Sequence, residues 1–299
     1  MIDVCIVTYC NEATIADTLA SIETKIGAVA VVVSVWDNSP DMKTVNAIDR
    51  FQGGASRLDI VVYHDGQNLG FGRSCNQLAQ SSKADWLLFL NPDAKIHQWP
   101  SEKFPTQVEF LVGAAVYFPD GSLQQTFGDD RAVLTELSAR LLRRRKKVIL
   151  GQTAFGADFV SGAAFVASRS RYLASGGFDA DRYFMYYEDI DLGRRWRLAG
   201  GTVVVDPSWQ VVHYGGFSAK QNQALALVRS FESARAYHKR WSAGARLFRM
   251  VCIVECLGKL TLGVTTGHVG STDVKTQWRL FKYLVSGKSP KDPIPRKLD

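Results

Sequence analysis

Apolar runs and amphipathic stretches alternate through the first third of the chain. Four apolar runs rich in β-branched and aromatic residues predict strands at residues 1–8, 29–36, 58–64 and 86–90. Three segments between them carry apolar residues at helical spacing and predict helices at 13–24, 42–51 and 74–82. Strands that alternate with helices predict a parallel, doubly wound sheet with right-handed crossovers.

After residue 93 this alternation stops, and the pattern predicts a mixture of elements. Expected strands are 108–118 and 122–127, paired around a turn at Pro119-Asp120-Gly121, then 159–168, 203–205 and 211–213. Expected helices are 131–145, 188–198, 221–241, 245–262 and 274–285. The tail from Ser289 contains three prolines and several charges and is expected to be loose.

Polar side chains follow two of the predicted buried strands. Strand 86–90 stops at Asn91-Pro92 and Asp93 follows at once, and strand 29–36 leads into Asp37. Ligands of open α/β sheets bind beyond the carboxyl ends of the strands. A carboxylate held there by a buried strand can bind a divalent cation against a diphosphate.

The composition narrows the classes of partner. The 299-residue chain has 46% hydrophobic residues and a formal net charge of +7, which favours anionic partners or serves solubility alone. Nucleic acid is disfavoured because we find no zinc-ligand spacing and no RNA-binding signature. The five cysteines have no metal-binding spacing, and no signal peptide precedes the first strand, so we expect reduced thiols in the cytoplasm. The most apolar stretch, 247–264, contains three charged residues and does not predict a membrane span.

A glycine-rich segment follows the third predicted strand. Its glycines, Gly66, Gly70 and Gly72, do not form the G-x-G-x-x-G pattern, and the first strand has no such loop. A nicotinamide-binding domain is therefore disfavoured.

Six short motifs follow one another along the chain. They are Val7-Thr8-Tyr9-Cys10-Asn11-Glu12, Asp37-Asn38-Ser39, Asn68-Leu69-Gly70-Phe71-Gly72, Asn91-Pro92-Asp93, Glu188-Asp189-Ile190-Asp191 and His213-Tyr214-Gly215-Gly216. In this order and spacing, residues 1–240 resemble the family 2 inverting glycosyltransferases of the GT-A fold, most closely the bacterial rhamnosyltransferase-type members. In the first motif, Cys10 is an inserted residue, because the family usually has Asn directly after Tyr.

The resemblance implies a domain plan. Residues 1–218 would form the GT-A catalytic domain, with a Rossmann-like nucleotide-sugar-binding half at 1–93 and a mixed-sheet acceptor half at 94–218. Residues 219–288 would form a C-terminal helical region, and 289–299 a loose tail.

The resemblance also implies a donor site. Asp37 would accept a hydrogen bond from the N3–H of a pyrimidine, although its motif is also a good turn. Thr8, Tyr9 and Glu12 would line the base and ribose pocket. The diphosphate would meet Asn68, Gly70 and Arg73, because glycine lets backbone amides approach, a helix N-terminus favours anions and arginine adds a fork of donors.

Asp93 is the expected ligand of Mg²⁺ or Mn²⁺. The family's aspartate-x-aspartate motif is reduced here to Asn91-Pro92-Asp93, so one strong ligand remains, with Asn91 near the substrate. His213 would add a ligand or contact the diphosphate, or it is a hydrogen-bonded histidine at a strand end.

Three acids open the predicted helix at 188. Acids in a first turn stabilise the helix dipole, which is a sufficient structural reason for one or two of them. By the resemblance, Asp189 is the base that takes the acceptor hydroxyl's proton, and Glu188 and Asp191 support it, with Asp191 also in contact with the substrate. Gly162, in a run of small residues, marks a close approach to the substrate. One displacement with one base inverts the anomeric carbon.

The function that the resemblance implies is transfer of L-rhamnose from dTDP-rhamnose, or of another sugar from a UDP-sugar. The acceptor would be a hydroxyl of a bacterial cell-surface glycan precursor that is lipid-linked. The alternative is a non-catalytic nucleotide-sugar-binding scaffold; a nucleotidyltransferase is disfavoured because the first strand–helix loop is not glycine-rich and basic. The protein would be cytoplasmic, with peripheral contact to the inner membrane as an option, and the Arg143–Lys147 run would attract anionic lipid. The C-terminal helices would bind a membrane, form a homodimer or pack on the catalytic domain.

Overall fold

The computed structural model describes residues 1–26, 29–54, 56–100, 107–129, 150–215, 223–266 and 271–287. In these ranges the main sheet has nine strands, and a path of eight runs β3-β2-β1-β4-β10-β6-β11-β5, with β8 paired to β11. Its strands are β1 (Ile2–Thr8), β2 (Val31–Asp37), β3 (Asp59–His64), β4 (Trp86–Leu90), β5 (Ala94–Gln98), β6 (Phe110–Tyr117), β8 (Phe155–Gly156), β10 (Ala164–Ser168) and β11 (Thr202–His213). A small second sheet pairs β7 (Phe127–Gly128) with β9 (Phe159–Val160).

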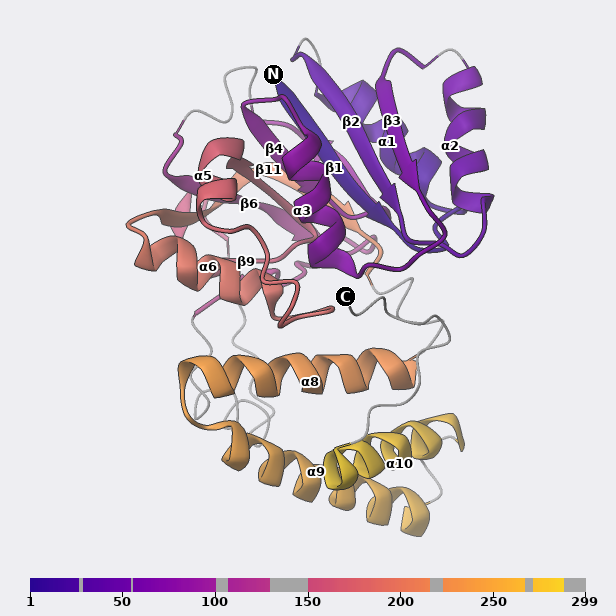
Figure 1. The fold of residues 1–299 in the computed structure, drawn as a ribbon, viewed down its shortest axis with the longest axis vertical. Helices are drawn as coiled ribbons and strands as arrows, with labels where there is room; N and C mark the ends of the chain where they lie inside the picture. The colour runs from indigo at the N-terminus through magenta and orange to yellow at the C-terminus, as the bar shows by residue number, and fades with distance from the viewer. Residues whose placement is uncertain are drawn as a thin grey trace.

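Half of the main sheet is parallel. Strands β3, β2, β1 and β4 all run the same way, and the register aligns Thr8 with Asp37 and Asp37 with His64. Every residue of β1 is buried, as expected for a strand covered on both faces. The covering helices are α1 (Ile15–Lys25), α2 (Lys43–Gly53) and α3 (Phe71–Ser81). The last residues of three strands therefore meet at one edge of the sheet (Figure 1).

The other half of the sheet is mixed. β10 lies antiparallel between β4 and β6, β11 runs parallel to β6, and β5 pairs antiparallel with β11 at the edge. Two helices pack on this half, α5 (Arg169–Ala174) and α6 (Glu188–Leu198). This arrangement confirms the predicted union of a parallel half with a mixed half.

The structure corrects several predicted elements. β5 and α5 were not predicted, and the strands expected at 203–205 and 211–213 are one strand, β11, with an irregular register between Asp206 and Gln210. The strand expected at 159–168 is interrupted at 161–163. Helix α3 begins at Phe71, so it includes part of the glycine-rich segment. The predicted helix at 131–145, the Arg143–Lys147 run, Gly216 and the tail from Ser289 lie outside the described residues.

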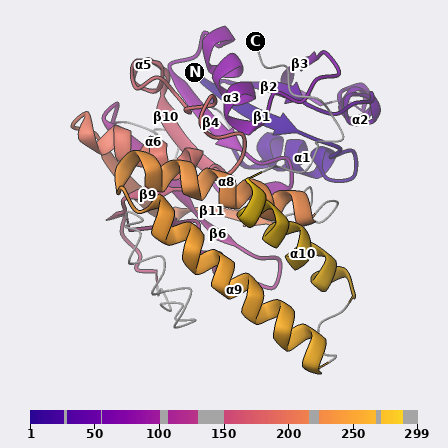
Figure 2. The same ribbon diagram turned by 60° about the horizontal axis from the view of Figure 1, so that its bottom comes forward.

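Three helices follow the sheet: α8 (Gln223–Trp241), α9 (Ala245–Thr266) and α10 (Ser271–Ser286). α8 lies between the sheet and the other two helices (Figure 1), and α9 and α10 lie side by side in both views (Figure 2). A shared core joins α8 to the segment before α6 through Tyr183, Tyr187, Val228 and Tyr237. Across the described part of the chain, we find no helix that is long and apolar enough to cross a membrane.

Candidate active site

Three neighbouring strand ends share one hydrogen-bonded network around Asp37. This side chain is fully buried, and its Oδ1 accepts hydrogen bonds from the hydroxyls of Thr8, at 2.7 Å, and Ser39. The Nδ1 atom of His64 lies 3.1 Å from Oδ2 and leaves His64 partly exposed above the carboxylate. A molecule that approaches this edge therefore meets His64 before Asp37.

The glycine-rich segment is tied to the same strand ends. Asn38 Oδ1 accepts hydrogen bonds from the Leu69 amide and the Ser74 hydroxyl, both at 3.1 Å. Asn68 Oδ1 accepts a hydrogen bond from the amide of Gly70. Gly70 has a φ of +82° and is the N-cap residue of α3. These bonds fix the start of α3 beside the Asp37 network.

Three predicted donor-site residues are less buried than the Asp37 network. Arg73 is half-exposed on α3 and pairs with Asp181 at 2.7 Å. Tyr9 is half-buried and its amide donates to Asn11 Oδ1, whereas Glu12 is exposed. Arg73 and Glu12 can therefore reorient without disturbing the core.

Asp93 and His213 meet at the end of the mixed half. His213 Nε2 lies 3.1 Å from Asp93 Oδ1, and both side chains are almost fully buried. His213 Nδ1 lies 2.9 Å from Gln124 Oε1, and Asn91 Nδ2 lies 3.2 Å from Nε2. The pair, separated by 120 residues, is brought together because β5 and β11 are neighbours.

This pair fits a divalent cation. With Nδ1–H donated to Gln124, His213 presents a lone pair at Nε2, opposite a carboxylate oxygen of Asp93. Two adjacent ligands of an octahedral ion at about 2.1 Å lie about 3.0 Å apart, close to the observed separation. No cluster of three or more His, Cys, Asp or Glu side chains suited to a metal occurs among the described residues. Substrate and water would complete the shell.

Asp189 lies close to this pair through a short chain of hydrogen bonds. Its Oδ2 accepts the amide of Gly162 at 3.3 Å, in the break between β9 and β10. The next residue, Ala163, accepts the amide of Asn91 at 2.9 Å. A Cβ at Gly162 would lie 2.8 Å from Phe71, so the close approach expected there is to a protein ring. The segment 161–163 thus joins Asp189 to the Asn91–Asp93 turn.

Glu188 has different surroundings from its neighbour. It is buried, and its Oε2 has no hydrogen-bond partner in the structure. Burial raises the pKa of Glu188 well above its ordinary value, and the nearby Asp189 adds to the increase. Burial therefore favours the neutral form of Glu188, and Asp189 is the member of the pair that solvent reaches.

The backbone is strained immediately before α6. Tyr186 and Tyr187 have φ values of +72° and +66°, which bulky residues rarely adopt. Phe184 in this segment packs against Gly70, where a Cβ would lie 2.8 Å from the ring. Strain of this kind persists only where the surrounding packing enforces it, and it is typical of functional sites.

Asp191 is bound entirely by protein donors. Its carboxylate is fully buried and accepts hydrogen bonds from Tyr183 (3.2 Å), Arg195 (2.6 Å), Arg240 (3.1 Å) and Trp241 (2.8 Å). Arg240 and Trp241 belong to α8. The geometry does not support the predicted contact of Asp191 with substrate and instead makes it the link between α6 and α8.

Sequence reasoning missed four residues of this site: His64, Gln124, Arg240 and Trp241. His64 is the last residue of a predicted strand, a signal that could have been used. The other three are recognised only from long-range packing.

Comparison with known proteins identifies the class. The profile of glycosyl transferase family 2 matches residues 3–171, more than half of the chain, and the chain belongs to this family. The predicted family resemblance is thereby confirmed.

Curated relatives narrow the comparison. The chain is 28% identical over 274 residues to an N-acetylglucosaminyl-diphospho-decaprenol L-rhamnosyltransferase of Mycobacterium tuberculosis, covering 79% of this chain and 84% of the relative. It is 26% identical over 174 residues to rhamnosyltransferase WbbL of Escherichia coli K12, covering 51% and 63%.

Solved structures support the GT-A fold. GalNAc-T7 with UDP, GalNAc and Mn²⁺ superposes with a TM-score of 0.54 at 14% identity, over 71% of this chain and 43% of that chain. Mannosyltransferase PcManGT of Pyrobaculum calidifontis, in complex with GDP-Man and Mn²⁺, gives 0.51 at 16% identity over 95% and 85%. The predicted fold class is confirmed.

Proposed function

We propose that this glycosyltransferase transfers L-rhamnose from dTDP-L-rhamnose to a hydroxyl of a lipid-linked saccharide, with inversion at the anomeric carbon. The curated relatives, which are rhamnosyltransferases, support the sugar, and the diphospho-decaprenol in one relative's name supports the acceptor. The observation that carries the proposal is the placement of Asp189 beside the Asn91–Asp93 turn. A base and a leaving-group site there belong to one reaction centre.

In the proposed reaction, the oxygen of the acceptor hydroxyl attacks the anomeric carbon. Asp189 accepts the proton that this hydroxyl loses. The bond between that carbon and the diphosphate oxygen breaks, and its electron pair leaves with the nucleoside diphosphate. The Gly162 amide orients Asp189, and the raised pKa of the buried Glu188 disfavours a second negative charge beside it. One displacement of this kind gives inversion.

The donor would lie along the edge formed by β1, β2 and β3. His64, with Asp37 buried behind it, would meet the pyrimidine. The N-terminus of α3, which begins after Gly70 and which the Asn68–Gly70 hydrogen bond holds in place, would meet the diphosphate. Asp93 and His213 would hold Mg²⁺ or Mn²⁺, which neutralises charge on the leaving diphosphate when bound. The Mn²⁺ in two superposed glycosyltransferases supports this assignment.

The lipid-linked acceptor implies work at a membrane surface, which we propose to be its cytoplasmic face. The five cysteines support this side, because all of them are free thiols.

The test is a transfer assay with dTDP-L-rhamnose, a GlcNAc-diphospho-prenol analogue and Mg²⁺ or Mn²⁺. Wild-type protein should form a rhamnosyl product whose anomeric configuration, measured by NMR, is opposite to that of the donor. Asp189→Asn should lower kcat by about 10²–10⁴-fold, the range of a lost general base.

The matched control is Asp59→Asn, an exposed aspartate at the opposite end of β3, which should retain wild-type kcat. Donor binding without turnover under any of these conditions would favour the non-catalytic scaffold. Normal turnover by Asp189→Asn would exclude Asp189 as the base.

A further inference from the structure

Helix α9 carries an exposed apolar stripe. Leu247, Met250, Val254 and Leu257 follow one another at intervals of three and four residues, which places them on one face of the helix. All four are exposed, with Met250 and Val254 at 65% and 69%. A soluble helix normally turns such a face inward, so this stripe needs an explanation.

The stripe points away from the rest of the protein. On the opposite face of α9, Phe248 packs against Phe231 of α8, and Cys256 Sγ lies 3.6 Å from the Gln277 carbonyl of α10. Both neighbouring helices therefore occupy the other side of α9. Figure 1 shows α9 and α10 on the side of α8 that is remote from the sheet.

Helix α10 adds an aromatic and cationic surface. Trp278 and Val285 are about half-exposed, and Trp278 stacks on Phe281 with ring centroids 5.6 Å apart. The ammonium of Lys282 lies 5.5 Å from the Trp278 ring. Tryptophan beside lysine is the combination that is enriched at the boundary between lipid headgroups and acyl chains.

Positive charge is concentrated in the same part of the chain. Residues 223–299 contain 14 of the 36 Lys and Arg but 5 of the 29 Asp and Glu, a net charge of +9. Residues 1–222 contain the other 22 and 24, a net charge of −2. The excess charge of the whole chain therefore belongs to the region that carries the exposed stripe.

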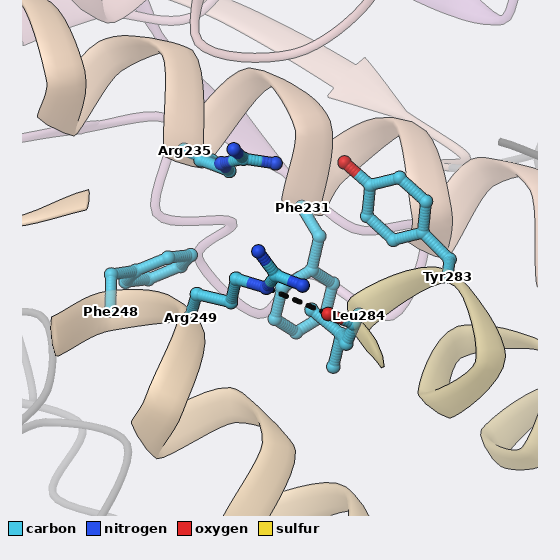
Figure 3. A pocket seen from close by; sticks show the side chains of 6 residues that line it. All are labelled: Phe231, Arg235, Phe248, Arg249, Tyr283 and Leu284. Carbon is cyan, nitrogen blue, oxygen red and sulfur yellow. Dashed lines mark hydrogen bonds between the residues drawn. The ribbon is translucent and has the colours of Figure 1, made fainter. Parts of the chain in front are cut away.

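A small hollow lies between the three described helices. Arg235 and Arg249 line a hollow between α8, α9 and α10 together with Phe231 and Tyr283 (Figure 3). Arg249 is occupied by hydrogen bonds to the carbonyls of Leu284 and Val285 in α10, and the free space in the hollow is sufficient for about one water molecule. This hollow is therefore too small for a partner molecule, whereas the outer faces of α9 and α10 expose large apolar side chains.

We propose that the exposed faces of α9 and α10 dock on a bilayer that contains anionic phospholipid. Aliphatic side chains would enter the acyl boundary, and the surrounding lysines and arginines would meet the headgroup phosphates. The carboxyl ends of the parallel strands point toward α8, so the reaction centre faces the same side of the molecule (Figure 1). The purpose of this docking rests on the proposed function, because a lipid-linked acceptor lies in that bilayer.

The test is flotation of the full chain with phosphatidylcholine vesicles, with and without phosphatidylglycerol. Binding should require phosphatidylglycerol and weaken as salt increases. The double variant Met250→Asp/Val254→Asp should bind at least about tenfold more weakly, because two buried aliphatic side chains are lost. The double variant Arg279→Gln/Lys282→Gln should lose about fivefold for each charge removed.

Two matched controls lie on the sheet part of the protein. Leu198 is 70% exposed at the end of α6, and Lys83 is exposed before β4. Leu198→Asp and Lys83→Gln should bind vesicles like the wild type. Equal losses in the controls would overturn the proposal, as would wild-type binding by the α9 variant.

Two other occupants of the stripe predict different results. If a second copy covers it, light scattering will show a dimer that Met250→Asp/Val254→Asp dissociates while vesicle binding is unchanged. If another part of this chain covers it, the same variant will lower the thermal midpoint without changing vesicle binding. Either result would overturn the proposal.

Docking and chemistry can fail separately. Transfer to a short, water-soluble acceptor analogue should be equal in wild type and docking variants. Vesicle binding without any transfer would refute the proposed function alone, and transfer without vesicle binding would refute the docking surface alone.

Discussion

Two adjacent carboxyl groups open α6 in different environments. Glu188 is buried with one oxygen unpaired, whereas Asp189 is half-buried and accepts a backbone amide. Enzymes commonly separate the roles of neighbouring acids through such differences in burial. Here the difference in burial supports the proposed role of Asp189 as the base.

Glu188→Gln should change the pH dependence of stability. The native chain holds a proton that the unfolded chain releases above pH about 4.3, because burial raises the native pKa of Glu188. The unfolding free energy therefore falls as pH rises from there toward the native pKa. The glutamine variant should be more stable than wild type near pH 8 and similar at pH 4 in urea unfolding. The same pH dependence in both proteins would contradict this account; Asp59→Asn serves as the exposed control.

Gly162→Ala should lower kcat by about tenfold to a hundredfold, the cost of a small misplacement of a reacting group. The added Cβ would lie 2.8 Å from Phe71 and would displace the amide that orients Asp189. Gly156→Ala is the matched control, because a Cβ there meets nothing within 4 Å. Steady-state rates at saturating donor and acceptor give the comparison, and equal kcat values for the two variants would refute the orienting role.

At the scale of elements, side chains at the end of α8 form hydrogen bonds with α6. Asp191 on α6 accepts hydrogen bonds from Arg240 and Trp241 at the end of α8, and the Trp241 ring lies 4.6 Å from the Arg240 guanidinium. Ser233 on α8 also donates to the Met185 carbonyl in the strained segment. Helix α8 thus fixes the position of α6, the helix that carries Asp189.

Trp241→Phe should destabilise the protein by about 1.5–3 kcal/mol, the contribution of a hydrogen bond to a charged group. It should also lower kcat while the KM for the donor stays constant, since the donor edge is separate. A double-mutant cycle with Asp191→Asn, measured by urea unfolding, should give a coupling energy above about 0.5 kcal/mol. Strictly additive effects would mean that the two side chains do not act together.

The elements of the parallel half could be predicted because each is a local pattern. Apolar periodicity located β1 to β4 and their helices to within a few residues. It missed β5, a short edge strand (AKIHQ) with a polar end, because its assignment depends on pairing with β11. Periodicity also could not show that β10 inserts between β4 and β6, which are distant in sequence.

The residues of the candidate site likewise fall into those with a local sequence signal and those without one. Asp93 and Asp189 belong to short motifs that the sequence displays directly. Gln124 behind His213 and Trp241 behind Asp191 carry no local signal, since each partner lies 50 or more residues away. The fully buried state of Asp37 was likewise hidden, because only the fold places His64 over it.

At the scale of the whole molecule, the donor nucleotide and the cation should together raise the thermal stability of the native state. A ligand present at 100 times its Kd stabilises the native state by about 2.7 kcal/mol, which for a chain of this size is roughly 5 °C in Tm. We expect dTDP with Mn²⁺ to raise Tm by more than either alone. Thermal shifts of Asp93→Asn and His213→Ala should lose the extra increment, and retention of it would exclude the pair as the cation site. Asp59→Asn should keep it.

The link between Asp191 and α8 has a consequence for how the enzyme is made. Ribosomes release the N-terminal part of a chain first, and domains begin to fold as they emerge. Every strand of the sheet precedes residue 214, whereas Arg240 and Trp241 emerge later. A nascent chain can therefore complete the described sheet before α6 is anchored through Asp191, so the position of α6 is fixed last, during synthesis of the C-terminal helices.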